Sequence, residues 1–81
     1  MESSQIVALL EAAFPDCTIA VEGGDGKFMV SAVGDVFDGL TAVKRQKAVY
    51  GVLNEHIRSG AIHAVTMRLS TPAEQATSAS Q

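Results

Sequence analysis

The 81-residue sequence has little of several residue types, and each shortage excludes a class of protein. It has one cysteine, Cys17, so no internal disulfide can form, which excludes a disulfide-stapled secreted fold. It has no tryptophan and only 5% aromatic residues, so its core must be mostly aliphatic. It lacks a secretory signal and any run approaching the roughly 20 apolar residues that cross a bilayer. We therefore expect a soluble cytoplasmic protein without membrane contact.

Basic residues are also few. Six Lys and Arg against nine Asp and Glu give a net charge of −3, which argues against a protein that binds nucleic acid over most of its surface. Half of the basic residues are nevertheless clustered at Lys44, Arg45 and Lys47. No paired carboxylates, Ser/His/Asp set or nucleotide loop stands out, and a domain this small has little room for a deep cleft. The sequence thus predicts a protein that is not an enzyme.

Hydrophobic residues make up 47% of the chain, and their spacing predicts a single α+β domain. The periodic patterns predict helices at 3–14 and 42–58, strands at 17–22, 27–33 and 62–69, and a helical turn before Gly39. Ser3 or Ser4 is expected to cap the first helix, and Thr41 the long one. The order αββααβ suits a three-stranded sheet covered on one face by helices.

The long helix and the last strand each predict a buried face. The expected helix stripe is Val43, Val49, Tyr50, Val52, Leu53 and Ile57. Gly51 lies within it, and since glycine in a helix costs about 1 kcal/mol relative to alanine, we expect close packing there. Alternation in the strand directs His63, Val65, Met67 and Leu69 toward the helices.

The chain is predicted to divide at residue 72. The segment 73–81 is small and polar and has no large apolar anchor, so we expect a domain over 1–72 followed by a disordered tail.

Two side chains are candidate metal ligands. His63 offers an imidazole inside an apolar run, and it is either an ordinary core histidine or a ligand. Cys17 shares a strand face with Ile19 and Val21, and it is either a small buried hydrophobe or a ligating thiol. One His and one Cys cannot close a tetrahedral site, so a metal would need ligands from a partner.

Two further motifs suggest binding surfaces. Gly23 to Gly26, "GGDG", has the G-x-x-G spacing of a KH-domain phosphate clamp, but it joins two strands and carries an acid. We interpret it as a hairpin turn. The basic cluster at 44–47 is either a solvated helix face or a docking patch for an acidic partner or phosphates. Cations are unfavourable at a helix N-terminus, which favours the functional interpretation.

At this point the sequence resembles a known family. The runs "VGDVFDGLTAVKRQKAVYGVL" and "IHAVTMRLSTPAE" contain Phe37-Asp38-Gly39, a basic cluster before Val49-Tyr50, His63-Ala64 and Thr71-Pro72. This combination resembles the BolA family, in particular its shorter bacterial IbaG (YrbA-like) branch, over residues 3–74.

The resemblance implies a class II KH-like fold and two activities. The first is a non-enzymatic adaptor role in iron–sulfur cluster assembly or trafficking. Its partner would be a monothiol CGFS glutaredoxin, with a bridging [2Fe–2S] cluster and glutathione. The alternative is a DNA-binding transcriptional regulator of stress response and morphology. In either case we expect a monomer or weak homodimer when the chain is alone.

The resemblance also implies residue roles. His63 matches the family's C-terminal cluster ligand, but Lys27 stands where IbaG-like relatives carry a loop histidine, and an ammonium is a poor ligand. Cys17 is the only thiol available as a substitute. The residues expected to contact a partner or nucleic acid are Gly39, Lys44, Arg45, Lys47 and Arg68.

Overall fold

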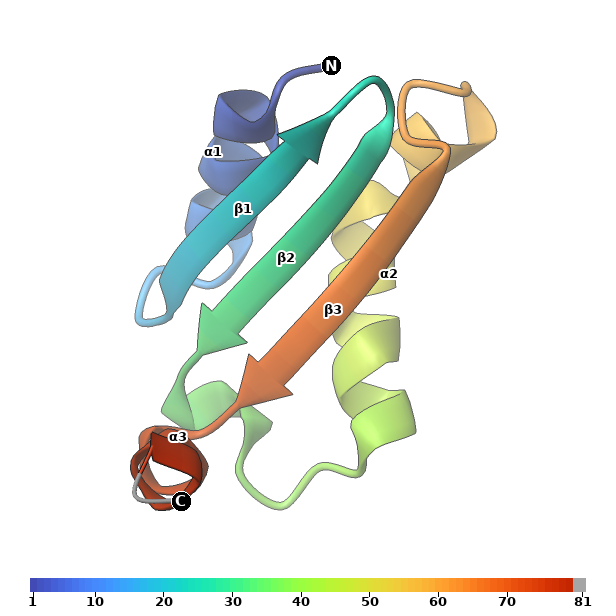
Figure 1. The fold of residues 1–81 in the computed structure, drawn as a ribbon. Coiled ribbons are helices and arrows are strands. Elements are labelled where there is room, and N and C mark those ends of the chain that lie inside the picture. Colours follow the sequence, from blue (N-terminus) through green and yellow to red (C-terminus); the bar gives the residue numbers. More distant parts are fainter. Residues whose placement is uncertain (80–81) are drawn as a thin grey trace.

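A computed structural model describes the backbone of residues 1–79 and the side chains of residues 1–76. Its elements are α1 (Ser3–Ala13), β1 (Thr18–Gly24), β2 (Lys27–Val33), the 3-10 helix η1 (Asp35–Phe37), α2 (Ala42–Arg58), β3 (Ala64–Ser70) and α3 (Pro72–Ala79). Figure 1 shows them along the chain. In the described part, no helix is both long enough and apolar enough to span a bilayer.

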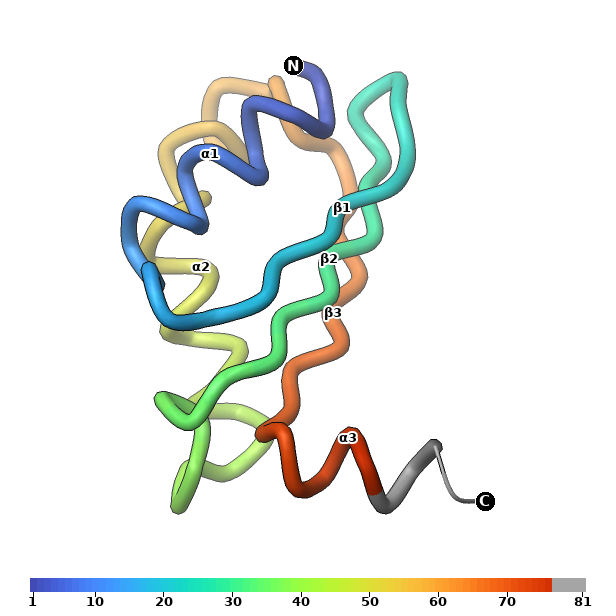
Figure 2. Tube along the Cα trace, turned by 90° about the vertical axis from the view of Figure 1, so that its left-hand side faces the viewer, coloured from blue at the N-terminus to red at the C-terminus, as the bar shows by residue number. Residues whose placement is uncertain are grey.

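The three strands form one sheet in the order β1-β2-β3. β1 and β2 pair antiparallel as a hairpin, whereas β2 and β3 pair parallel because α2 connects them. Figure 2 shows α1 and α2 together on one face of the sheet and leaves the other face open. This confirms the predicted α+β class, with helices covering one face of a three-stranded sheet.

The core lies between this sheet and the two helices. β2, the central strand, buries Phe28, Val30 and Ala32, whereas Met29 between them is exposed and Ser31 is half-buried, as alternation predicts. The remaining buried hydrophobic residues are Ile6, Leu10, Phe37, Val49, Leu53 and Ile62. The core is therefore mostly aliphatic, in agreement with the shortage of aromatic residues.

Two predicted members of the α2 stripe are not in the core. Val49 and Leu53 are fully buried, but Val43 is 59% exposed and Tyr50 is 36% exposed. The sheet and α1 cover only one side of α2, so apolar residues outside that arc face solvent. The prediction that these two side chains are buried is wrong.

The first helix begins at Ser3, as predicted, but its N-cap is not one of the two predicted serines. Glu2 is the N-cap, and its backbone N–H donates to the Gln5 side-chain oxygen at 2.7 Å. Ser3 and Ser4 lie inside the helix. The prediction overlooked that a glutamine three residues into a helix can close a capping box. For α2, by contrast, the predicted cap is confirmed, because Thr41 Oγ1 accepts from the Lys44 N–H at 3.3 Å.

The last strand begins at Ala64, two residues later than predicted. Ile62, which is 1% exposed, fills the core position, and His63 is exposed on the loop before the strand. The prediction that His63 faces the helices is therefore wrong. The rest of the predicted alternation in this strand is confirmed, because Val65, Met67 and Leu69 pack against the core.

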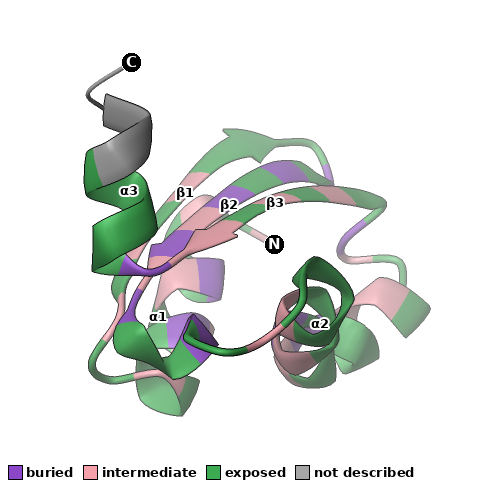
Figure 3. Cartoon of the chain, turned by 90° about the horizontal axis from the view of Figure 1, so that it is seen from below, coloured by how far each residue is buried: buried purple, intermediate pink, exposed green. Residues whose placement is uncertain are grey.

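The tail differs from the prediction as well. Residues expected to be disordered form α3, which extends to Ala79, and only residues 80–81 lie outside the described residues. α3 projects from the end of β3 toward the open side of the sheet, and in Figure 3 its residues 72–76 have the colour of exposed residues. An N-terminal cap and an ion pair, described below, compensate for its lack of apolar anchors.

Candidate functional site

His63 lies over the turn of the β1–β2 hairpin. Its backbone N–H and that of Ala64 both donate to the Gly26 carbonyl oxygen, at 2.6 and 3.0 Å. A Cβ atom added to Gly26 would lie 3.0 Å from His63 Cγ, so the imidazole packs directly on this glycine. Figure 1 shows the loop before β3 beside the hairpin turn, at the same end of the sheet. The fold thus holds an exposed imidazole at the hairpin tip.

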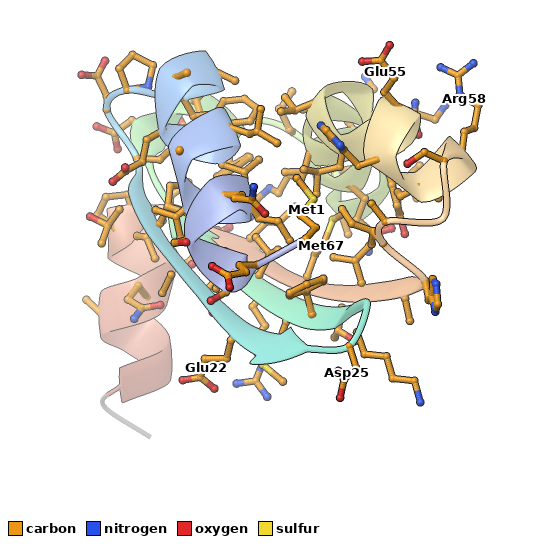
Figure 4. All side chains as sticks on the ribbon, turned by 90° about the horizontal axis from the view of Figure 1, so that it is seen from above. Met1, Glu22, Asp25, Glu55, Arg58 and Met67 are labelled. Carbon is orange, nitrogen blue, oxygen red and sulfur yellow. The ribbon has the colours of Figure 1, made fainter. Side chains whose placement is uncertain are left out.

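The turn itself is shorter than the glycine-rich motif suggests. Gly23 and Gly24 belong to β1, and Gly24 pairs with Lys27, so only Asp25 and Gly26 form the turn. Both have positive φ, 55° and 81°, as a type I′ turn requires. The hairpin interpretation of "GGDG" is confirmed, with a two-residue link in place of the expected four. In Figure 4, Glu22 and Asp25 project away from α1 and α2.

Lys27 comes directly after this turn and pairs with Ala64 in β3. It is exposed, so the hairpin tip presents an imidazole and an ammonium from adjacent strand ends. Among the residues that the structure describes, no group of three or more His, Cys, Asp or Glu could hold a metal ion. His63 is therefore a single nitrogen donor, and any metal bound there needs ligands from outside this chain.

Cys17 lies far from His63. It precedes Thr18, whose partner is Val33 at the end of the sheet opposite the hairpin turn. Thr18 and Gly24 are six residue steps apart along the strand, which corresponds to about 20 Å. Half-burial raises the pKa of the Cys17 thiol, and Asp16 raises it further, so this thiol is a poor source of thiolate. The structure does not bring the two candidate ligands together.

Arg45 is bound within the fold. Its guanidinium donates to the Leu40 carbonyl oxygen at 3.0 Å, to that of Leu69 at 3.2 Å, and to both Glu74 carboxylate oxygens at 2.6 and 3.1 Å. Its side chain is only 13% exposed. Arg45 therefore joins the start of α2 to the end of β3 and to α3.

Glu74 completes this junction. Its carboxylate also accepts from the Thr71 N–H at 2.9 Å, and its own N–H donates to Thr71 Oγ1 at 3.2 Å, which together form a capping box at the start of α3. The hydrogen bonds from Arg45 lower the pKa of Glu74 to about 2, with the Thr71 N–H as the next cause. The signal was in the sequence, because Thr71-Pro72 followed by Glu74 is a typical helix start.

The other predicted contact residues do not form one surface. Lys44 and Lys47 are exposed on α2, and Gly39 is exposed in the link between η1 and α2. Arg68 alternates in β3 with residues that pack on the core, so it faces the open side of the sheet. The basic residues predicted to make contacts are therefore divided into an internal arginine, Arg45, two exposed lysines of α2, and Arg68 on another face.

Gly51 also differs from expectation. A Cβ atom added there would meet nothing within 4 Å, so the prediction of close packing around this glycine is wrong. The position lies in the middle of α2 and is exposed. The sequence did not predict that Gly51 lies on an exposed side of α2, because the pattern assigned Val43 and Tyr50, on the same side of the helix, to the core.

Comparisons with known proteins give a consistent result. A family model described as "BolA-like protein" matches residues 10–74. The chain is 43% identical to acid stress protein IbaG of Escherichia coli K12 over 76 residues, which cover 94% of this chain and 90% of that protein. It is 49% identical over 74 residues to an Acinetobacter guillouiae protein from the rpoN–murA intergenic region, covering 91% and 89% of the two chains.

The fold is similar to solved structures of the same kind. The BolA domain of SufE1 from Arabidopsis thaliana superposes with a TM-score of 0.80 at 30% identity, over 89% of this chain and 93% of that one. BolA1 from Arabidopsis thaliana gives a TM-score of 0.79 at 26% identity, over 91% and 98% of the two chains.

Proposed function

The chain belongs to the BolA-like protein family, and from this membership we propose that it is a non-enzymatic cytoplasmic adaptor in iron–sulfur cluster assembly or trafficking. Its partner in this proposal is a monothiol CGFS glutaredoxin, with which it shares a [2Fe–2S] cluster. A similarity to the BolA domain of SufE1 is compatible with such a role but does not specify the partner.

The observation that carries the proposal is the exposed imidazole of His63 on the hairpin turn. A [2Fe–2S] cluster accepts imidazole nitrogen on one iron in place of thiolate, and it needs four ligands in total. This chain offers one. The donor set therefore fits a cluster completed by a partner's thiolate and glutathione, and it does not fit a cluster held by this chain alone.

The chain's own residues have simple roles in this proposal. The Gly26 carbonyl oxygen, which accepts from His63 and Ala64, fixes the loop that carries the imidazole. Lys27, which follows the same hairpin turn, adds a positive charge to this end of the sheet, which favours the approach of an anionic thiolate-ligated group without coordinating it. Cys17 takes no part, because it lies at the other end of the sheet.

The test is a titration of this protein into cluster-loaded monothiol glutaredoxin, followed by visible absorption and circular dichroism. We expect wild type and Cys17→Ser to change the spectrum equally and His63→Ala to leave it unchanged. All three should still bind apo glutaredoxin. If wild type and His63→Ala change the spectrum alike, His63 is not the ligand.

The alternative, a nucleic-acid-binding regulator, has less support. It needs a dense cluster of free cations, but Arg45 is engaged by Glu74 and Arg68 faces the open side of the sheet, which leaves Lys44, Lys47 and Arg58 on α2. Its signature would be a salt-dependent affinity for duplex DNA that is lost when Lys44 and Lys47 are both replaced by alanine.

A further inference from the structure

The side of α2 that faces away from the core carries an unusual combination of residues. Spacing at three, four and seven positions places them on one face, here named the outward face of α2. Its members are Val43, Lys44, Lys47, Tyr50, Gly51, Asn54 and Arg58, with Glu55 at its edge, and all of them are exposed. Two of them, Val43 and Tyr50, are large hydrophobic residues that the fold leaves in solvent.

Gly51 has no function within the fold. Its backbone is helical, with no positive φ, and the space around a Cβ atom is empty. Alanine would therefore fit and would favour the helix. A glycine beside exposed Tyr50 does, however, leave a shallow gap in the helix surface. Helices pack with axes about 8–10 Å apart depending on the side chains at the contact, and glycine permits the closer distances.

The outward face is also positively charged in an acidic protein. α2 carries four of the six basic residues and only one acid, Glu55. Lys44, Lys47 and Arg58 have no ion pair or hydrogen bond from their side chains within the described part of the chain. In Figure 4, Glu55 and Arg58 both project outward from the last turns of α2. These cations are thus available to a partner.

This charge selects the occupant. Two copies of the chain docked through this face would oppose lysine to lysine across a two-fold axis, which disfavours self-association. A phosphate backbone would meet the cations but offers no apolar group to the exposed Val43 and Tyr50. An acidic protein surface with an apolar group at its centre matches both the lysines and the Val43–Tyr50–Gly51 gap.

We propose that the outward face of α2 is a docking surface for an acidic helix of a partner protein, seated over Gly51. The inference rests on the proposed function, in which that partner is the monothiol glutaredoxin. The last turn of α2 leads into the His63 loop, where the His56 carbonyl oxygen accepts from the Ile62 N–H at 3.0 Å. The helix that carries the outward face is therefore joined by one short loop to the segment that carries the imidazole.

The test compares Gly51→Gln with Ala12→Gln, which introduces the same side chain at an exposed position of α1. Affinity for apo glutaredoxin from the same organism is measured by calorimetry, and the contacted amides by ¹⁵N-HSQC spectra. We expect Gly51→Gln to weaken binding at least tenfold and Ala12→Gln to leave it unchanged. Wild-type shifts should centre on Val43, Lys47 and Gly51. Because glutamine is a good helix former, Gly51→Gln should melt no lower than wild type.

Three outcomes would overturn the inference. If Gly51→Gln binds as wild type does and the shifts lie elsewhere, the docking surface is wrong but the adaptor function stands. If wild type binds no glutaredoxin even at high micromolar concentration, the proposed function fails and this inference fails with it. If a 20-base-pair DNA duplex, and not glutaredoxin, shifts the same amides in a salt-dependent way, the face binds nucleic acid.

Discussion

At the scale of single residues, the position of His63 depends on a glycine in another segment. The His63 imidazole packs against the Gly26 Cα, and the Gly26 carbonyl oxygen accepts hydrogen bonds from the N–H groups of His63 and Ala64. Gly26 also has a φ of 81°, where a side chain is strained. The imidazole that would bind the cluster and the glycine that positions it are thus different residues. A change at Gly26 should therefore alter the position of the His63 imidazole without removing it.

Gly26→Ala should therefore weaken both stability and the cluster signature. The Cβ atom would crowd the His63 ring, and the positive φ would cost about 1–2 kcal/mol. Urea denaturation measures the first effect and the dichroism titration the second. Gly24→Ala is the matched control, because its surroundings are open and its φ is not positive. Equal behaviour of the two variants would contradict a supporting role for Gly26.

Lys27→His should give the shared cluster a second imidazole ligand from this chain. The family resemblance implies a second ligand at this position, which here adjoins the turn on which His63 packs. A second imidazole should change the visible dichroism of the shared cluster and slow its loss to a chelator. Lys27→Met removes the charge without adding a ligand and should do neither. If Lys27→His behaves like Lys27→Met, the turn does not present this position to the cluster.

At the scale of elements, α3 depends on polar contacts rather than on apolar burial. Glu74 caps the helix and pairs with Arg45, which in turn holds the ends of β3 and the η1–α2 link. Because a partly exposed carboxylate makes most of these contacts, the attachment of α3 should depend on pH.

The direction follows from the lowered pKa of Glu74, about 2 against an ordinary 4.5. Stabilisation by ionised Glu74 is fully present above pH 4.5 and is lost as the pH falls toward 2. Amide shifts and exchange rates of residues 73–76, recorded from pH 6 to pH 2, should show α3 detaching in this window. Glu74→Gln should show weak protection at every pH. A variant with wild-type pH dependence would exclude Glu74 as the responsible group.

In α2, Gly51→Ala should stabilise the free protein. The open surroundings mean no clash, so the gain should approach the full helix propensity difference of about 1 kcal/mol. For a domain of this size that corresponds to a rise in melting temperature of about 4–8 °C. Thermal unfolding at fixed pH measures it. A fall in melting temperature would mean that Gly51 has a structural role within the fold.

At the scale of the whole molecule, the small core leaves little reserve. A domain of this length has a free energy of unfolding on the order of 4–12 kcal/mol, and few fully buried side chains supply it. Ile62 is one of them, although it lies in the loop that carries His63. Core and candidate site are therefore adjacent in sequence and separable by mutation.

Ile62→Ala should cost about 2–5 kcal/mol because it leaves a cavity in a packed core. His63→Ala should cost much less, since the ring is exposed. Chemical denaturation of the two variants under identical conditions makes the comparison. A larger loss for His63→Ala would show that the imidazole contributes mainly to stability, which would weaken its assignment as a ligand.

Local patterns in the sequence determined most of the elements. Helical periodicity and Thr41 predicted α2 with its observed bounds, and alternation predicted the buried face of β2. The αββααβ order then limited the architecture to a sheet with helices on one face. These features depend on residues close together in the chain, which is why sequence reasoning reaches them. The capping box of α3 was equally local and could have been predicted.

Only the tertiary structure decided the site. The register of β2 with β3 brings His63 onto Gly26 and leaves Cys17 at the opposite end of the sheet. Because α3 lies close to the start of α2, Arg45 forms an ion pair with Glu74 and is largely buried, although the sequence predicts a surface cation. The width of the sheet decides which side of α2 remains exposed. Each of these outcomes depends on which distant segments become neighbours, and residue spacing along the chain does not contain that information.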